Sequence, residues 1–134
     1  MAKYKKKLDA DIRCPLEYGL TIFGGKSGEY PQKLYKALMN SQTVLTVWDD
    51  ARLVGLIRVL DDSEMLAQIH YVLVHPEYQG QGIAGRMVEY IKEKYKNFMY
   101  LELMPEDKNN VPFYEKHGFH VMENGAAVQI CNIN

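Results

Sequence analysis

The alternation of apolar and polar residues along the chain predicts strands and helices in mixed order. Between Gln81 and Tyr95, the side chains of Ile83, Met87 and Ile91 recur at the spacing of one helix face. Runs rich in β-branched and aromatic residues, separated by turns that contain Asp, Ser or Gly, predict strands. The predicted strands are residues 4–8, 43–48, 53–60, 65–74, 98–103, 119–122 and 128–131, and the predicted helices are residues 15–23, 31–40, 81–95 and 111–117.

The order of these elements predicts the fold class. Antiparallel hairpins come early and a strand–helix–strand unit follows, which is typical of an α/β domain with a mixed sheet, in the α+β sense. The 134 residues suit one domain, and a chain of this length can bury a core without added cross-links. No repeat or low-complexity linker interrupts the pattern, so we expect a single domain over residues 1–134.

Charge and composition narrow the classes of function. The chain carries 16 basic and 17 acidic residues, a net charge of −1, whereas nucleic-acid binding usually needs a strong basic excess. A local cluster at Lys3, Lys5, Lys6 and Lys7 is explained by a solvated terminal segment. No apolar run is long enough for a signal peptide or a membrane span. We therefore expect a cytoplasmic protein that binds neither nucleic acid nor membrane.

The cysteines and histidines do not form a metal-ligand pattern. Cys14 and Cys131 match no metal-ligand spacing, and two free thiols in a reducing compartment explain them simply, with a disulfide as the open alternative. His117 and His120 form one H-x-x-H pair without further ligands. The sequence therefore predicts no metal.

A glycine-rich segment between a predicted strand and a predicted helix carries the strongest local signal. Backbone N–H groups at the start of a helix point outward and, with the helix dipole, favour an anion. Glycines let the backbone approach a phosphate closely, and several amides can share the charge of a diphosphate. The residues of this segment are Gln79, Gly80, Gln81, Gly82, Ile83, Ala84, Gly85 and Arg86.

The same segment matches the G-x-G-x-x-G fingerprint of dinucleotide-binding proteins, with Glu102 near the position of the ribose-binding carboxylate. The context argues against that fold. A Rossmann loop turns directly from its strand, whereas residues His75 to Tyr78 intervene here, and too little chain follows for further β-α units. A glycine-rich turn without a ligand is the remaining structural alternative.

Two segments in the right order resemble the GNAT superfamily of N-acetyltransferases. The run from Val72 to Ala84 resembles its signature Gln/Arg-x-x-Gly-x-Gly/Ala after a strand, with Gln79, Gly82 and Ala84 in the signature places. The run from Phe113 to Phe119 is similar to the family's Phe-Tyr-Glu-Lys-x-Gly-Phe segment. The resemblance covers residues 53–119, the expected acyl-CoA-binding core, and leaves residues 1–45 as the expected acceptor side.

The resemblance implies a fold and a substrate. It implies a strongly twisted mixed sheet of about six to seven strands with about four helices, splayed between residues 65–74 and 98–103. The pantetheine arm of acetyl-CoA would lie in the splay along Val72, Leu73 and Val74, with the pyrophosphate on residues 79–86. Asn110 would touch the pantetheine or adenosine part, although Asp107 fits a commoner spacing and a helix N-cap explains either residue.

The resemblance places Tyr114 beside the sulfur of the thioester. A tyrosine hydroxyl is a donor at neutral pH and can protonate a leaving thiolate. The alternative is a tyrosine that packs on the core, as several of the ten tyrosines do.

His70 is the expected general base, because it is an ionisable residue on the strand before the glycine loop. Strict alternation would put His70, Val72 and Val74 on one face. A neutral histidine that fills a gap is the alternative, and Glu102 or water is the next candidate for the base. Gln68 stands where some histone-type members carry glutamate and cannot titrate, which weakens a histone-acetyltransferase assignment.

The resemblance implies a primary amine as the acceptor, on a small molecule or a protein. The sequence does not separate polyamines, arylalkylamines, aminoglycosides, amino acids or protein N-termini, and it is compatible with a homodimer. A non-catalytic acyl-CoA-binding or regulatory module is the competing class, since it would keep the glycine loop and could lose the proton-transfer residues.

Overall fold

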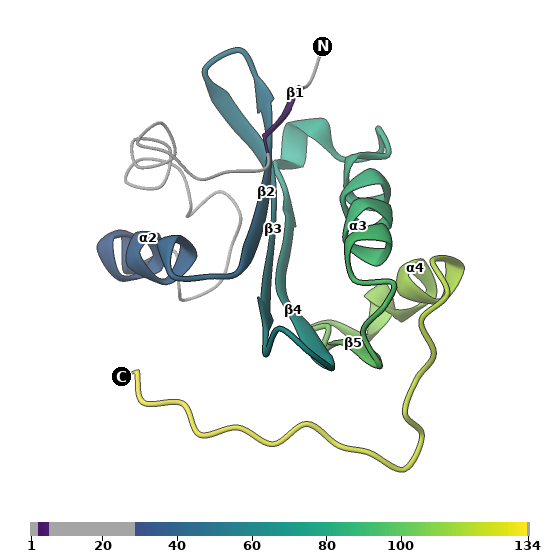
Figure 1. Cartoon of the computed structure of the whole chain (residues 1–134). Helices are drawn as coiled ribbons and strands as arrows, with labels where there is room; N and C mark the ends of the chain where they lie inside the picture. Colours follow the sequence, from purple (N-terminus) through teal and green to yellow (C-terminus); the bar gives the residue numbers. More distant parts are fainter. Residues whose placement is uncertain (1–2, 6–28, 134) are drawn as a thin grey trace. The chain divides into compact units, whose positions relative to one another are not determined.

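The computed structural model describes residues 3–5 and 29–133 of the chain, drawn in colour in Figure 1. The chain divides into two compact units, Met1–Leu103 and Met104–Asn134. The first unit holds the sheet and the two longer helices. The second unit holds a short helix and the C-terminal segment. The predicted helix over residues 15–23 lies outside the described residues.

A five-stranded sheet in the order β1-β2-β3-β4-β5 forms the frame of the first unit. Neighbouring strands from β1 to β4 are antiparallel, and β4 pairs with β5 in parallel. This mixed pairing confirms the predicted α/β class with early hairpins and a late strand–helix–strand unit. The strands are β1 (Lys3–Lys5), β2 (Thr43–Asp49), β3 (Arg52–Asp61), β4 (Leu66–Val74) and β5 (Tyr100–Leu103).

The two helices of the first unit lie on opposite faces of this sheet (Figure 1). Helix α2 (Pro31–Met39) begins with a proline at its first position, where a missing N–H costs nothing, and buries Leu34 and Leu38. These leucines pack in one cluster with Val44, Trp48 and Leu56 of the sheet. Helix α3 (Ile83–Lys94) buries the stripe Ile83, Met87, Val88 and Ile91, so the predicted amphipathic helix is confirmed.

Tyr95, directly after α3, ties the end of that helix to the sheet. Its hydroxyl donates to Asp61 Oδ2 at 2.6 Å and lies 2.6 Å from Thr43 Oγ1. Since the phenol proton points at Asp61, the threonine hydroxyl donates the second bond. Burial and the hydrogen bond to Asp61 raise the pKa of Tyr95 to about 12.

Gly55 of β3 allows the start of α3 to approach the sheet closely. A Cβ at this position would lie 3.1 Å from Cγ2 of Ile83 and 3.2 Å from Cβ and Cγ2 of Val47. These distances are shorter than ordinary carbon contacts of about 3.5–4.0 Å. The absent side chain therefore sets how near the first turn of α3 lies to β2 and β3.

The second unit contains less regular structure than the sequence pattern predicts. It has the 3-10 helix η5 (Lys108–Asn110) and helix α4 (Val111–Lys116). The predicted strands over 119–122 and 128–131 are wrong: these residues are not in strands, and Val128 and Ile130 are 93% and 88% exposed. Alternation marks residues that can form a strand, but a strand exists only with a partner for its backbone groups. The described residues thus hold five strands and three α-helices, not six to seven and about four.

Candidate active site

The strands β4 and β5 separate after a short stretch of parallel pairing. Residues Leu66 to Ile69 pair with Tyr100 to Leu103, and no further pairs join the two strands. β4 runs on to Val74 while still paired with β3 on its other side. Figure 1 shows β5 beside only one end of β4. Beyond Ile69, β4 therefore has no partner from β5, and the splay between residues 65–74 and 98–103 stays a prediction.

The hydrogen-bond pattern between β3 and β4 decides which backbone groups of β4 face its open edge. The N–H of His75 donates to the Val54 carbonyl at 2.8 Å. In an antiparallel pair every second residue bonds to the neighbouring strand, so Leu73 also directs its N–H and C=O toward β3. Val74 and Val72 turn theirs toward the open edge. In agreement, the side-chain amide of Gln79 reaches the Val74 carbonyl at 3.3 Å. Of the three residues predicted to line the pantetheine arm, Leu73 directs its backbone groups to β3 instead.

The glycine loop joins the end of β4 to α3. The 3-10 helix η4 (Pro76–Tyr78) comes first, and then Gly80 and Gly82 both adopt a φ of +82°, which side chains disfavour. A Cβ at either glycine would meet no atom of residues 3–5 and 29–133 within 4 Å, so the described part of the chain leaves the space above the loop open. Gly82 is the N-cap of α3 and, as a glycine, has no side chain that could cap the helix start. The loop thus presents uncapped backbone N–H groups to open space, which suits a phosphate group.

The residues predicted to hold the pyrophosphate differ in what they can offer. Gln79, Gly80, Gln81, Gly82 and Arg86 are exposed, Ala84 and Gly85 are half-buried, and Ile83 is buried. The Ile83 side chain therefore belongs to the core, and only its backbone faces the loop. Arg86 lies over the ring of Tyr4, with its guanidinium carbon 5.0 Å from the ring centre.

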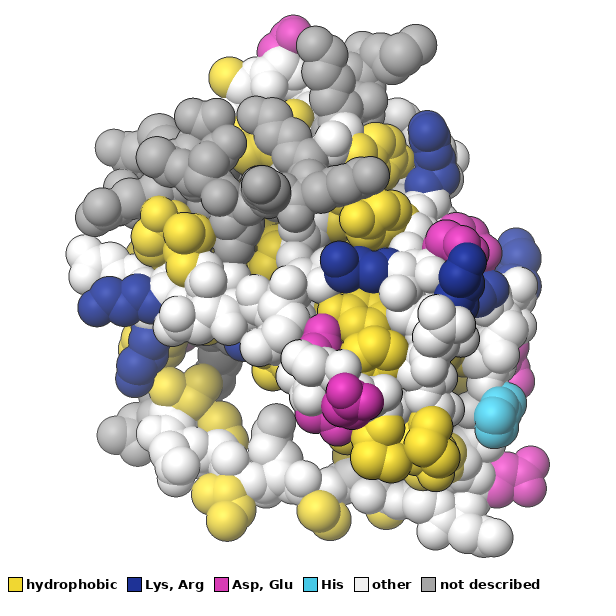
Figure 2. All heavy atoms as spheres, in the orientation of Figure 1, with side chains coloured by type: hydrophobic (Ala, Val, Ile, Leu, Met, Phe, Trp, Pro, Cys, Tyr) yellow, Lys and Arg dark blue, Asp and Glu magenta, His cyan; other side chains and the backbone are white. Residues whose placement is uncertain are grey.

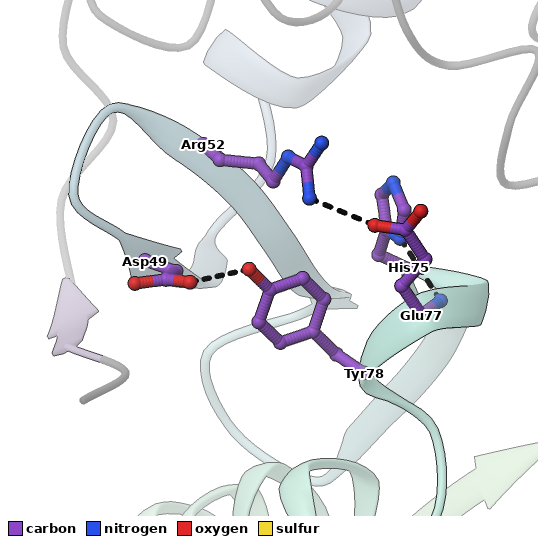
Figure 3. Close-up of polar contacts among 5 residues, drawn as sticks. All are labelled: Asp49, Arg52, His75, Glu77 and Tyr78. Atoms are coloured by element: carbon purple, nitrogen blue, oxygen red, sulfur yellow. Dashed lines mark hydrogen bonds and ion pairs between the residues drawn. The ribbon is translucent and has the colours of Figure 1, made fainter.

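A polar cluster that the sequence does not predict supports η4 from the β2–β3 hairpin (Figure 3). Tyr78 donates a hydrogen bond to Asp49, and Arg52 pairs with Glu77 at 2.9 Å. The hydrogen bond to Asp49 raises the pKa of the Tyr78 hydroxyl. His75 Nδ1 accepts a bond from the backbone N–H of Glu77 at 3.1 Å, so His75 stabilises the turn that begins η4. The turn that leads into the glycine loop is thus fixed at both ends.

His70 lies at a bulge in β4. Arg58 pairs with Tyr71 and Val59 pairs with Ile69, so His70 is the extra residue between them. The bulge interrupts the alternation that would place His70 with Val72 and Val74. The imidazole instead meets the Tyr71 ring, with centroids 4.4 Å apart, and its Nδ1 lies 2.8 Å from Nη1 of Arg58.

Arg58 is held in place on three sides. Its Nε donates to Ser41 Oγ at 2.8 Å, and Ser41 in turn donates to the Ala37 carbonyl of α2 at 2.7 Å. The guanidinium carbon lies 5.8 Å from the centre of the Tyr71 ring. Burial lowers the pKa of Arg58 from its ordinary value, although a guanidinium keeps its proton in proteins. A fixed positive charge therefore stands beside His70.

Glu102 of β5 lies near this group by register. It pairs with Gln68 in the parallel ladder, two positions before His70. Side chains of residues paired across a sheet point to the same face, so the half-buried Glu102 and the exposed Gln68 share a face. Arg58 of β3 and His70 of β4 are thus in contact, and Glu102 of β5 lies opposite a residue two positions before His70.

Asn110 and Tyr114 belong to the second unit, whereas the glycine loop, the open edge of β4 and His70 belong to the first. Tyr114 on α4 is half-buried, with its ring centre 5.0 Å from that of Phe113 and 5.9 Å from that of Phe119. Burial raises the pKa of the Tyr114 hydroxyl above its ordinary 10.0. Asn110 makes no side-chain cap bond, while Asp107 accepts the N–H of Asn109 at 2.9 Å. The capping alternative thus applies to Asp107.

The surface charge, the metal-ligating residue types and the helix lengths indicate no further kind of site in the described residues. On the face in Figure 2, acidic and basic side chains are interspersed. Among residues 3–5 and 29–133, no three or more His, Cys, Asp or Glu side chains come together as metal ligands would. No helix within the part that the structure describes has the length and apolar character to cross a bilayer. The cytoplasmic location stays a prediction.

Sequence comparison identifies the class of protein. The pattern of the Acetyltransferase (GNAT) family matches residues 16–119, most of the chain. The chain belongs to this family of acetyltransferases, which confirms the resemblance seen in the segments at 72–84 and 113–119.

Individual relatives agree with the family. An uncharacterized N-acetyltransferase from the lysA 3' region of Bacillus methanolicus is 34% identical over 117 residues, 87% of this chain and 92% of the relative. An uncharacterized ycf52-like N-acetyltransferase from Prochlorococcus marinus is 28% identical over 99 residues, 70% of this chain but only 55% of the relative. A probable acetyltransferase of unknown function from meticillin-resistant Staphylococcus aureus has a TM-score of 0.83 at 27% identity, covering 99% and 100% of the two chains.

Proposed function

We propose that this protein transfers an acetyl group from acetyl-CoA to a primary amine by direct attack of the amine on the thioester. The observation that carries the proposal is the open edge of β4, which leads within a few residues to the uncapped start of α3. An extended arm that ends in a diphosphate fits this sequence of a strand edge and an anion site. Pantetheine and pyrophosphate are joined in this order in coenzyme A.

Binding would use backbone groups more than side chains. The amides of the pantetheine arm would pair with the outward N–H and C=O groups of Val72 and Val74. The diphosphate would lie over Gly80 and Gly82, where no Cβ intrudes, and accept bonds from the N–H groups of Ile83, Ala84 and Gly85. The Gln79 amide now bonded to Val74 would exchange that bond for one with the arm.

The chemistry needs a neutral amine, a stabilised oxyanion and a protonated leaving group. The amine nitrogen forms the new N–C bond as the C–S bond breaks, a base takes one proton from the nitrogen, and Tyr114 gives one to the thiolate. The raised pKa of Tyr114 keeps its hydroxyl protonated at neutral pH, as a general acid requires. The bulge at His70 frees a backbone group from the ladder at the height where the thioester would lie.

The proposal also assigns the base, the acyl-CoA-binding residues and the acceptor. His70 on β4 and Glu102 on β5 are the two candidates for the base. Residues 53–119 would form the acyl-CoA-binding core of one functional domain, and Asn110 and Tyr114 fall within this range. The acceptor would be a small-molecule amine or a protein amine, met on the side of residues 1–45.

The deciding experiment separates binding from transfer. Calorimetry with coenzyme A tests the site in the wild type and in Gly82→Val. Gly125→Ala is the matched control, since its Cβ would make only ordinary contacts and Gly125 is far from the glycine loop in the sequence. A panel of amines with acetyl-CoA, read by free thiol and by the mass of the acetylated product, tests the activity. Binding without transfer to any amine would support the non-catalytic acyl-CoA-binding module instead, and no binding would overturn both.

A further inference from the structure

We propose that Arg58 is a positioning residue that fixes His70 as a hydrogen-bond donor, and that the carboxylate of Glu102 takes the proton of the acceptor amine. The inference deepens the proposed acetyl transfer and rests on it. Its first part concerns the state of one imidazole ring and can be tested without any acceptor.

The bond between Arg58 and His70 determines where the ring carries its proton. Nη1 of Arg58 lies 2.8 Å from Nδ1 of His70. A guanidinium has only donors, so Nδ1 must be the acceptor and must be unprotonated. The neutral imidazole then carries its single hydrogen on Nε2. In this state Nδ1 uses its lone pair for Arg58, and Nε2 has none to offer, so the ring donates and cannot take a proton without losing the bond.

Arg58 cannot turn away from His70 at no cost. Its Nε is bonded to Ser41 Oγ at 2.8 Å, and Ser41 is anchored to the carbonyl of Ala37 in the last turn of α2. The guanidinium is also half-buried over the Tyr71 ring. With Nε held, the planar fork aims Nη1 at His70, so the contact follows from the fixed shape of the guanidinium.

Among the described residues, the charged group in contact with the His70 ring opposes its protonation. Arg58 faces the ring from β3 and Tyr71 contacts it from β4, and the register places Glu102 on β5 across from Gln68. A second proton would set a donor on Nδ1 against the donor on Arg58, with two like charges at hydrogen-bond distance. The carboxylate on β5 is the one group of this set that both attracts an ammonium ion and accepts its proton.

Nitrogen-15 NMR of the histidine rings tests the role of Arg58. His70→Gln identifies the His70 signals among the 4 histidines, and spectra are taken near pH 8 on protein without substrates. We expect Nδ1 unprotonated and Nε2 protonated as a single tautomer. Arg58→Met should restore a mixture of tautomers and let the ring gain its second proton at a higher pH. Arg58→Lys is the second variant, because it keeps a charge but lacks the fork.

Arg52→Met is the matched control for the spectra. It removes a guanidinium from the same strand, but one that pairs with Glu77 instead of His70, so the His70 signals should not move. A proton on Nδ1 in the wild type, or His70 signals that are the same in the wild type and in both Arg58 variants, would overturn the proposal whether or not acetyl transfer occurs.

Kinetics with an identified acceptor test the second part. Glu102→Gln should lower kcat by ~100-fold or more, the range of general base catalysis, and Glu102→Asp should recover part of the loss. His70→Gln keeps a side-chain donor and should keep most of kcat. A large loss of kcat in His70→Gln together with near-normal kcat in Glu102→Gln would return the base to His70 and refute the inference.

Discussion

Replacing Gly55 by alanine tests whether the close approach of α3 to the sheet sets the geometry of the glycine loop. The new Cβ would lie 3.1 Å from Cγ2 of Ile83 and 3.2 Å from two atoms of Val47, a few tenths of an ångström inside ordinary contact. Such overpacking costs about 1–3 kcal/mol. Alanine also restricts the unfolded chain, which stabilises the folded state by about 0.4–1 kcal/mol. We therefore expect the free energy of unfolding to fall by about 1–2 kcal/mol.

The measurement is urea unfolding of both proteins. With a slope of about 1–3 kcal/mol/M for small proteins, this loss lowers the midpoint by about 0.3–2 M without changing the slope. Ile83 is the first residue of α3, so the strain should also shift the helix start and weaken coenzyme A binding in calorimetry.

Ile83→Leu supplies the control, because leucine lacks the Cγ2 atom that would be crowded. This volume-conserving change should cost less than about 1.5 kcal/mol alone. Combined with Gly55→Ala it should recover part of the loss, with a coupling of at least about 0.5 kcal/mol. The contact with Val47 remains, so the recovery is partial. A Gly55→Ala protein as stable as the wild type, or a double variant whose costs simply add, would refute the reasoning.

Three further predictions follow from single groups. Gly82→Val should weaken coenzyme A binding at least tenfold in calorimetry while the fold persists in circular dichroism, because a φ of +82° strains a side chain that would also enter the open space above the loop; unchanged affinity in a folded variant would remove the loop from the site. Tyr114→Phe should keep the affinity and lose ~100-fold or more in kcat, and near-normal turnover would make Tyr114 structural. The pKa of Tyr95 is about 12 when folded and 10.0 ordinarily, so the contribution of Tyr95 to the free energy of unfolding is complete below pH 10 and is lost as the pH rises toward 12. The urea midpoint of the wild type should fall over that pH range, and an equal fall in Tyr95→Phe would contradict the assignment.

The elements that the sequence predicts best are those with a local cause. The stripe of Ile83, Met87 and Ile91 predicts α3, and the glycines before it predict an uncapped helix start, because both features lie within one stretch of chain. The hairpins are predicted because turn residues separate β-branched runs. The observed bounds differ from the predicted ones by one or two residues at most ends, where capping and fraying decide.

The features that the sequence does not predict depend on pairing between distant residues. The bulge at His70 exists because β3 offers one residue where β4 has two, which no pattern within β4 reveals. The contacts of Arg58 with His70 and of Asp49 with Tyr78 join residues on different elements. The predicted strands at 119–122 and 128–131 are wrong because an alternating pattern indicates only which side chains would share a face, not whether a neighbouring strand is available to pair with.

The open edge of β4 has a consequence for handling the protein. A strand edge without a neighbouring strand is a template on which a second chain can add its own strand. Coenzyme A and a neighbouring molecule would therefore compete for the same backbone groups of Val72 and Val74. Preparations stripped of the coenzyme should self-associate at high concentration and disperse when it is restored, so light scattering would report occupancy of the site without any knowledge of the acceptor.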